Sequence, residues 1–188
     1  MITIPLRILL VEDSETDVSL IKRNINKIVE NTEFEVVENL SGCENKLLNF
    51  IPDLVISAYN LPSCDGFEIL ELTRSINPEM PFIFITGTIE DEDLAANTIL
   101  GGATGFILKK HMHCLDEKLK PLLKKIVYNI VGHDDFRERI RKNKIAVNQI
   151  YNYLDELHDD NEEQRGNIDK IRKDIENYKS GGDDANNS

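Results

Sequence analysis

The 188-residue sequence contains no tryptophan, and aromatic residues make up only 6% of it. Only three cysteines are present, and their wide spacing and odd number argue against a disulfide scaffold or a zinc site. No apolar run approaches the roughly 18 residues of a membrane-spanning helix, and the N-terminus has no signal-peptide pattern. Basic residues are outnumbered, 22 against 34 acidic ones, so the net charge of −12 disfavours non-specific binding to nucleic acid or anionic membrane. We therefore expect a cytoplasmic protein that binds neither.

Short apolar runs alternate with helical patterns through residues 1–131. Continuous apolar runs are typical of strands buried on both faces, and their alternation with helices predicts a doubly wound α/β fold with a five-stranded parallel sheet. Ligands of such sheets bind at the carboxyl ends of the strands. The expected strands are 8–11, 34–37, 54–57, 82–85 and 106–108, and the expected helices are 14–30, 43–50, 67–76, 92–100 and 116–131.

The pattern changes after residue 131 to a heptad repeat, which predicts a long helix or coiled coil over 132–179, followed by a disordered tail at 180–188. An isolated helix of this kind exposes its apolar seam, so a partner is required. One solution is a parallel homodimer, favoured by an asparagine at an a position; the other is a bend at 159–161 or at Gly166 that gives an intramolecular hairpin. The seam positions proposed for the dimer are Ile140, Val147, Ile150, Leu154, Leu157, Asn161, Ile168, Ile171 and Ile175.

Polar residues follow four of the predicted strands, where the carboxyl ends meet at one edge of the sheet. Glu12 and Asp13 follow the first strand, Thr86 the fourth and Lys109 the fifth. An adjacent acidic pair suits a hard cation such as Mg²⁺, and a lysine with a hydroxyl suits phosphoryl oxygens. The simpler interpretation is that Glu12 and Asp13 only stabilise the start of the following helix.

Taken together, residues 5–131 resemble the receiver domain of two-component response regulators. The resemblance is carried by ILLVEDS at 8–14, DLVISAYNLP at 53–62, Asp65-Gly66, FIFITG at 82–87 and GATGFILK at 102–109. It implies a flavodoxin-like fold and a histidine kinase or phosphotransfer protein as partner. It also implies that Glu12, Asp13 and the backbone carbonyl of Asn60 bind Mg²⁺, and that Lys109 contacts the phosphoryl group. Thr86 and Phe106 would form the conformational switch, although Phe106 could equally be a packed strand residue.

Ala58 stands where the family has its phosphoacceptor aspartate. A methyl group can neither accept a phosphoryl group nor bind a metal, so we expect no phosphorylation at this position and weak or absent Mg²⁺ binding. Either an aspartate has been replaced by alanine in a working receiver, or the chain is a natural degenerate receiver that acts as a phosphorylation-independent adaptor through its C-terminal helix. In neither case is the chain expected to be an enzyme, since the parent would catalyse only its own phosphorylation.

Overall fold

The computed structural model describes residues 1–87, 101–130, 134–160 and 170–176. The chain divides into two compact units, Met1–Asp134 and Asp135–Ser188, which are described separately below. The fourth helix expected at 92–100 and the tail expected at 180–188 lie outside the described residues.

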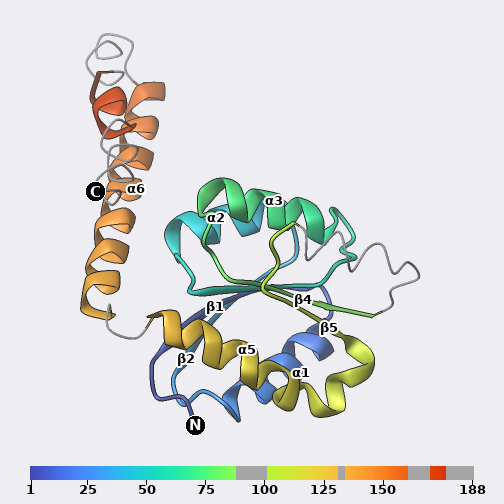
Figure 1. Ribbon diagram of the computed structural model, residues 1–188. Coiled ribbons are helices and arrows are strands. Elements are labelled where there is room, and N and C mark those ends of the chain that lie inside the picture. Colours follow the sequence, from blue (N-terminus) through green and yellow to red (C-terminus); the bar gives the residue numbers. More distant parts are fainter. Residues whose placement is uncertain (88–100, 131–133, 161–169, 177–188) are drawn as a thin grey trace. The chain divides into compact units, whose positions relative to one another are not determined.

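The first unit contains a five-stranded parallel sheet, as predicted, and its strand order is β2-β1-β3-β4-β5 (Figure 1). Its strands are β1 (Leu6–Val11), β2 (Thr32–Val37), β3 (Leu54–Ser57), β4 (Phe82–Thr86) and β5 (Gly105–Leu108). The order reverses direction between β1 and β3, which is the switch point where ligands bind in sheets of this class. The register pairs Val11 with Ser57 and Thr86 with Leu108, so these strands end side by side.

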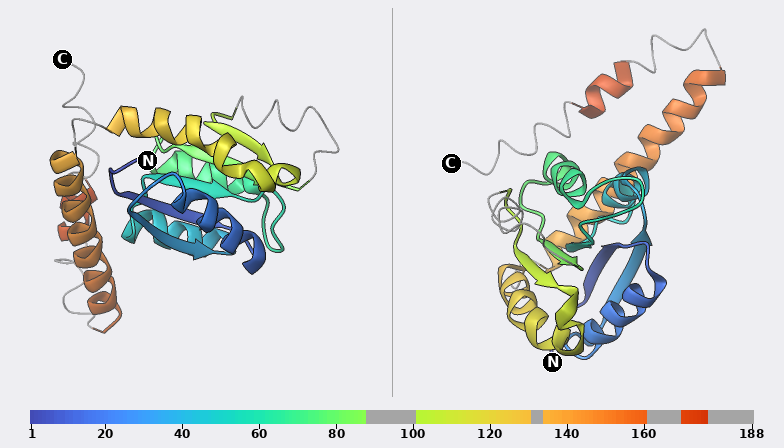
Figure 2. Two further views of the ribbon diagram at one scale, coloured as in Figure 1. Left: turned by 90° about the horizontal axis from the view of Figure 1, so that it is seen from below. Right: turned by 90° about the vertical axis from the view of Figure 1, so that its right-hand side faces the viewer.

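Helices cover both faces of the sheet (Figure 2). On one face α1 (Glu15–Asn26) and α5 (Leu115–Ile130) pack on inward side chains such as Ile8 and Ile56. On the other face α2 (Leu40–Asn49) and α3 (Gly66–Ile76) pack on side chains such as Val55 and Phe84. Because all strands except the edge strands are buried on both sides, they lack polar alternation, which explains the continuous apolar runs in the sequence.

The helix starts follow from capping side chains. Ser14 accepts a hydrogen bond from the Asp17 N–H at the start of α1, and Asp65 forms a reciprocal capping box with Glu68 at the start of α3. The expected start of α2 at residue 43 is wrong, because Asn39 accepts from the Gly42 N–H and begins the helix at Leu40. A 3-10 helix that was not predicted, η1 (Lys109–Cys114), connects β5 to α5.

The second unit contains α6 (Asp134–Asp160) and a helical segment at 170–176. Arg172 in that segment donates a hydrogen bond to the Asp155 carboxylate, and its guanidinium lies 5.6 Å from the centre of the Tyr151 ring. In an unbroken helix, residues 155 and 172 would lie about 25 Å apart along the axis. Of the two alternatives left open by the sequence, these contacts therefore correspond to the hairpin and not to one continuous helix.

Apolar side chains along α6 and the return segment stay partly open to solvent. Ile140, Ile150 and Ile171 are 40%, 52% and 45% exposed, and Val147, Leu154 and Ile175 are half-buried. The side chains of Leu157, Asn161 and Ile168, which were also predicted to lie in the seam, fall outside the described residues. No helix among the described residues is both long and apolar enough to span a bilayer.

Candidate functional site

The candidate site lies at the carboxyl ends of β1, β3, β4 and β5. Glu12 follows β1, Ala58 follows β3, Thr86 is the last residue of β4, and Lys109 follows β5. The backbone N–H of Ala58 donates to the Val11 carbonyl at 2.9 Å, which continues the β1–β3 pairing one residue beyond β3. The parallel register thus brings together residues that are far apart in the sequence.

Lys109 is held by two carboxylates. Its ammonium nitrogen lies 2.8 Å from Oε2 of Glu12 and 2.5 Å from Oδ2 of Asp17. The Glu12 side chain is only 3% exposed, whereas the side chains of Lys109 and Asp17 are 24% and 23% exposed. The other Glu12 oxygen, Oε1, accepts the Ser14 N–H at 3.1 Å. Lys109 therefore compensates a carboxylate that is almost entirely removed from water.

The pKa values of this pair reflect its burial and its contacts. Burial raises the pKa of Glu12 above 4.5, although the contacts from Lys109 and the Ser14 N–H act in the opposite direction. Burial also opposes the charged form of Lys109, but the hydrogen bonds and negative charges of Asp17 and Glu12 outweigh it and raise the Lys109 pKa. Lys109 is therefore cationic at neutral pH.

Close packing surrounds residue 58. Ala58 is 4% exposed, and the Gly66 N–H donates to the carbonyl of the next residue, Tyr59, at 2.6 Å. A Cβ atom at Gly66 would lie 2.5 Å from the Ala58 carbonyl oxygen and 2.7 Å from the Phe84 ring. The Asp65-Gly66 motif therefore lets the start of α3 approach the backbone at the end of β3, which fixes the position of residue 58.

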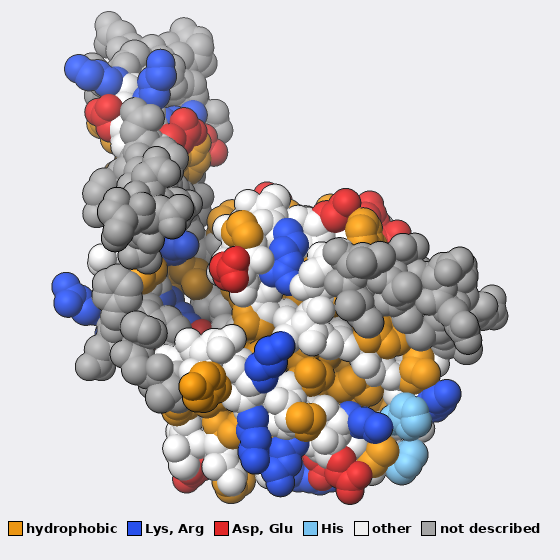
Figure 3. Space-filling view, viewed as in Figure 1, with side chains coloured by type: hydrophobic (Ala, Val, Ile, Leu, Met, Phe, Trp, Pro, Cys, Tyr) orange, Lys and Arg blue, Asp and Glu red, His pale blue; other side chains and the backbone are white. Residues whose placement is uncertain are grey.

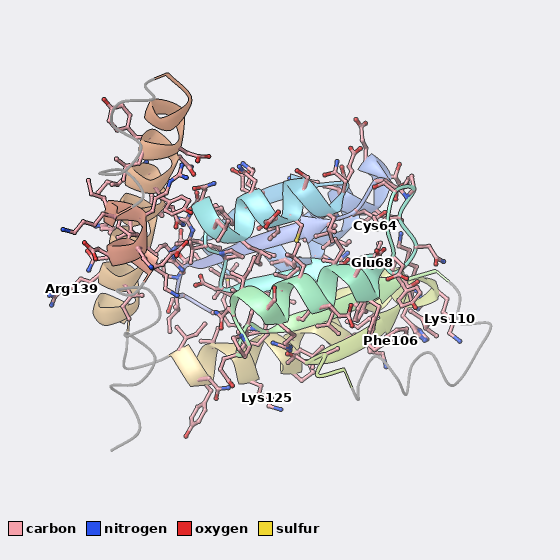
Figure 4. The ribbon with its side chains drawn as sticks, turned by 90° about the horizontal axis from the view of Figure 1, so that it is seen from above. Cys64, Glu68, Phe106, Lys110, Lys125 and Arg139 are labelled. Carbon is pink, nitrogen blue, oxygen red and sulfur yellow. The ribbon has the colours of Figure 1, made fainter. Side chains whose placement is uncertain are left out.

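The two predicted switch residues lie on neighbouring strands. Thr86 is 2% exposed. Phe106 of β5 is half-buried, and its ring centroid lies 6.3 Å from that of Phe84, within the core on the α2–α3 side of the sheet (Figure 4). This is the packed position expected of a strand residue, and the switch role of Thr86 and Phe106 stays a prediction.

The residues proposed as metal ligands make up a poor donor set. Asp13 and Asn60 are both exposed, but Glu12 is already bound to Lys109, and Ala58 offers no side-chain oxygen. Among the described residues, no three Asp, Glu, His or Cys side chains gather closely enough to hold a metal. Mg²⁺ prefers several oxygen ligands in octahedral geometry, so the residues present fit this ion poorly.

The sequence interpretation missed Asp17, which binds Lys109. A signal for it was present, because Asp17 is one helical turn after Asp13 and sits three residues after the capping Ser14. It therefore belongs to the first turn of α1, at the same end of the sheet as the predicted pocket. The histidines of η1 are a separate feature: His111 and His113 have ring centroids 6.4 Å apart, and histidine side chains occupy one margin of the face in Figure 3.

Comparison with known proteins agrees with this geometry. The model of the response regulator receiver domain matches residues 8–120. The chain belongs to this family. Receiver domains interact with histidine kinases or phosphotransfer proteins, generally bind Mg²⁺ at an acidic pocket, and are generally not enzymes.

Individual relatives match the same region. The uncharacterized transcriptional regulatory protein YvcP of Bacillus subtilis (strain 168) is 33% identical over 120 residues, which cover 63% of this chain and 49% of YvcP. The sensory transduction protein BceR of Halalkalibacterium halodurans is 29% identical over 123 residues, which cover 64% of this chain and 51% of BceR. The solved structure of the non-phosphorylated HemR receiver domain from Leptospira biflexa matches with 26% identity and a TM-score of 0.54, over 65% of this chain and 94% of that chain. The chain spans about half the length of the curated relatives.

Proposed function

We propose that this chain is a two-component receiver protein that cannot be phosphorylated at position 58. The observation that supports this proposal is an alanine directly after β3, beside β1, which ends at Val11 and is followed by Glu12. Phosphoryl transfer to a receiver needs a carboxylate oxygen as nucleophile, and the methyl group of Ala58 supplies none. In this proposal the receiver still docks on a histidine kinase or phosphotransfer protein, but no phosphoryl group is passed to residue 58.

Weak or absent Mg²⁺ binding belongs to the same proposal. Glu12 and Asp13 supply two carboxylates, but the Glu12 side chain is bound to Lys109. A metal would have to displace that lysine or share the carboxylate with it. We therefore expect Mg²⁺ affinity in the millimolar range or weaker, with Asp13 and the Asn60 carbonyl as the accessible oxygens.

We favour an aspartate-to-alanine replacement in a working receiver as the origin of Ala58. Glu12, Asp13, Thr86 and Lys109 all remain at the positions that the family motif requires. A chain that had long lost the chemistry would be expected to accumulate changes at these positions too. In the parent, Lys109 would neutralise the charge of the phosphoryl group and Thr86 would respond to it.

The alternative function is a phosphorylation-independent adaptor. It is favoured by the Lys109 contacts, since the ammonium group already has two carboxylate partners and needs no phosphoryl group to balance its charge. In this alternative the first unit is a docking platform and the C-terminal helices carry the output. In both cases we propose that the exposed apolar seam of α6 and residues 170–176 mediates homodimer formation.

Intact-mass spectrometry after incubation with acetyl phosphate and Mg²⁺ tests the proposal. We expect no mass change for the chain with Ala58 and the addition of one phosphoryl group for Ala58→Asp. The variant Ala58→Asn is the matched control, because it restores the size of the side chain but not the nucleophile. Phosphorylation of the unchanged chain within the pocket would contradict the proposal. Failure of Ala58→Asp to react would favour the degenerate adaptor over the replaced aspartate.

A further inference from the structure

One long edge of α6 stands beside the apolar seam, and the three of its side chains that the structure describes are exposed. At intervals of seven residues it carries Arg139, Ala146, Tyr153 and Asp160. Arg139 projects outward from the helix (Figure 4), Ala146 is exposed, and Tyr153 is 61% exposed. We call these four positions the g edge, from their place in the heptad.

The return segment contacts the opposite edge of α6. Arg172 binds Asp155 and lies over the Tyr151 ring, and these two residues are about half a turn around the helix from the g edge. Among the described residues, the return segment therefore contacts this flank of the seam, and Arg139, Ala146 and Tyr153 on the g edge stay exposed. Ile150, the seam residue next to the g edge, is 52% exposed, and Ile140 is 40% exposed.

Charge is distributed unevenly along α6. Residues 137–144 contain five basic side chains and one acidic one, whereas residues 155–160 contain four acidic side chains and no Lys or Arg. This arrangement opposes the helix dipole, which favours acidic residues at the N-terminus and basic residues at the C-terminus. An isolated helix gains nothing from such a pattern. A second helix running in the opposite direction places each basic half against an acidic half.

We propose that two copies of this chain associate through their g edges with the α6 helices antiparallel. The heptad allows a register in which Val147 lies level with Ile150 of the second chain, close to the two-fold axis. In that register the g positions of the two chains pair with an offset of about 3 Å along the axis. Arg139 then pairs with Asp160 of the second chain, and the large Tyr153 pairs with the small Ala146. The g edge is then complementary to itself in both charge and size.

A parallel pair lacks this complementarity. In a parallel coiled coil the g position faces the e position of the next heptad, which places Arg139 opposite Lys144 of the second chain. Together with the two intramolecular return segments, the antiparallel arrangement forms a bundle of four helices instead of a two-stranded coil. This inference rests on the proposed homodimer and specifies its orientation and its contact residues.

Sedimentation equilibrium of the full-length chain and its variants tests the orientation, because Arg139→Asp has opposite effects in the two arrangements. In the antiparallel pair it creates two repulsive contacts with Asp160, and we expect the dimer Kd to rise about tenfold or more. In a parallel pair it replaces repulsion from Lys144 with attraction, and the Kd would fall. Lys173→Asp, which makes the same charge change at an exposed outward position of the return segment, is the matched control and should leave the Kd nearly unchanged.

Two further variants complete the test. We expect Arg139→Asp combined with Asp160→Arg to restore the Kd of the natural chain, and Tyr153→Ala to weaken the dimer without changing its salt dependence. A Kd that is unchanged or lower in Arg139→Asp overturns the antiparallel orientation while leaving the homodimer intact. A natural chain that stays monomeric at every concentration overturns both the orientation and the proposed homodimer.

Discussion

Replacing Lys109 by methionine removes the cation that compensates the buried Glu12. The Glu12 carboxylate is 3% exposed, and removing one partner of a buried ion pair costs about 3–5 kcal/mol. Because Lys109 itself is 24% exposed, solvent screening reduces this cost, and we expect a loss of about 2–3 kcal/mol of unfolding free energy at pH 8. Methionine retains most of the side-chain length, so lost packing contributes little to this loss.

The pH dependence identifies Glu12 as the cause. The Glu12 pKa is raised in the folded chain and rises further without Lys109, whereas in the unfolded chain it titrates near 4.5. The variant therefore loses stability as the pH rises from 4.5 toward its folded pKa, by up to about 1.4 kcal/mol per pH unit. The pKa of Lys109 is raised above its ordinary value of 10.5 in the folded chain. The stability that the protonated lysine contributes is therefore fully present below pH 10.5 and is lost only as the pH rises through its folded-state pKa. This contribution does not vary between about pH 5.5 and pH 8.

Urea unfolding followed by circular dichroism at pH 5.5 and pH 8 measures both effects. We expect the destabilisation by Lys109→Met to be at least 1 kcal/mol larger at pH 8 than at pH 5.5. Adding Glu12→Gln should recover most of the loss at pH 8 and abolish the pH dependence. Equal destabilisation at the two pH values, or no recovery in the double variant, would refute the assignment of Glu12 and Lys109 as a coupled buried pair.

Three further predictions concern packing and helix ends in the receiver unit. Gly66→Ala should lower the unfolding free energy by about 2–3 kcal/mol, because its Cβ would lie 2.5 Å from the Ala58 carbonyl oxygen; an effect below 0.5 kcal/mol in urea unfolding would contradict this contact. Asp65→Ala should cost about 1 kcal/mol through loss of the α3 capping box, and an unchanged urea midpoint would argue against that role. Burial raises the Cys43 pKa to about 12, so at pH 8 a thiol reagent should modify the native chain at the half-buried Cys64 and Cys114 first; rapid labelling of Cys43 would mean that its environment is open.

The sequence was most informative for the sheet. Strands buried on both faces carry few polar side chains, so β1, β3 and β4 stand out as apolar runs with nearly the observed boundaries. The same parallel arrangement explains why Glu12, Thr86 and Lys109 could be assigned to one edge of the sheet, since the carboxyl ends of parallel strands all lie at that edge.

Other features depend on contacts that no local pattern encodes. The start of α2 is set by one capping side chain, that of Asn39. Asp17 belongs to the site only because Lys109, which follows β5, contacts it in the first turn of α1. The reversal after α6 is equally hidden, because the heptad repeat continues through it. A repeat of apolar positions predicts that a helix needs a partner, but it does not say whether the partner is a second chain or the same chain folded back.

The central claim is that the lack of a carboxylate at residue 58 weakens Mg²⁺ binding. The most direct test is a Mg²⁺ titration of the chain with Ala58 and of Ala58→Asp, followed by two-dimensional ¹H–¹⁵N NMR. We expect millimolar or weaker binding to the chain with Ala58, with small shifts at Asp13 and Asn60, and binding at least tenfold tighter once the third carboxylate is restored. Tight, saturable binding of Mg²⁺ by the chain with Ala58 at Asp13, with no gain in Ala58→Asp, would contradict this claim.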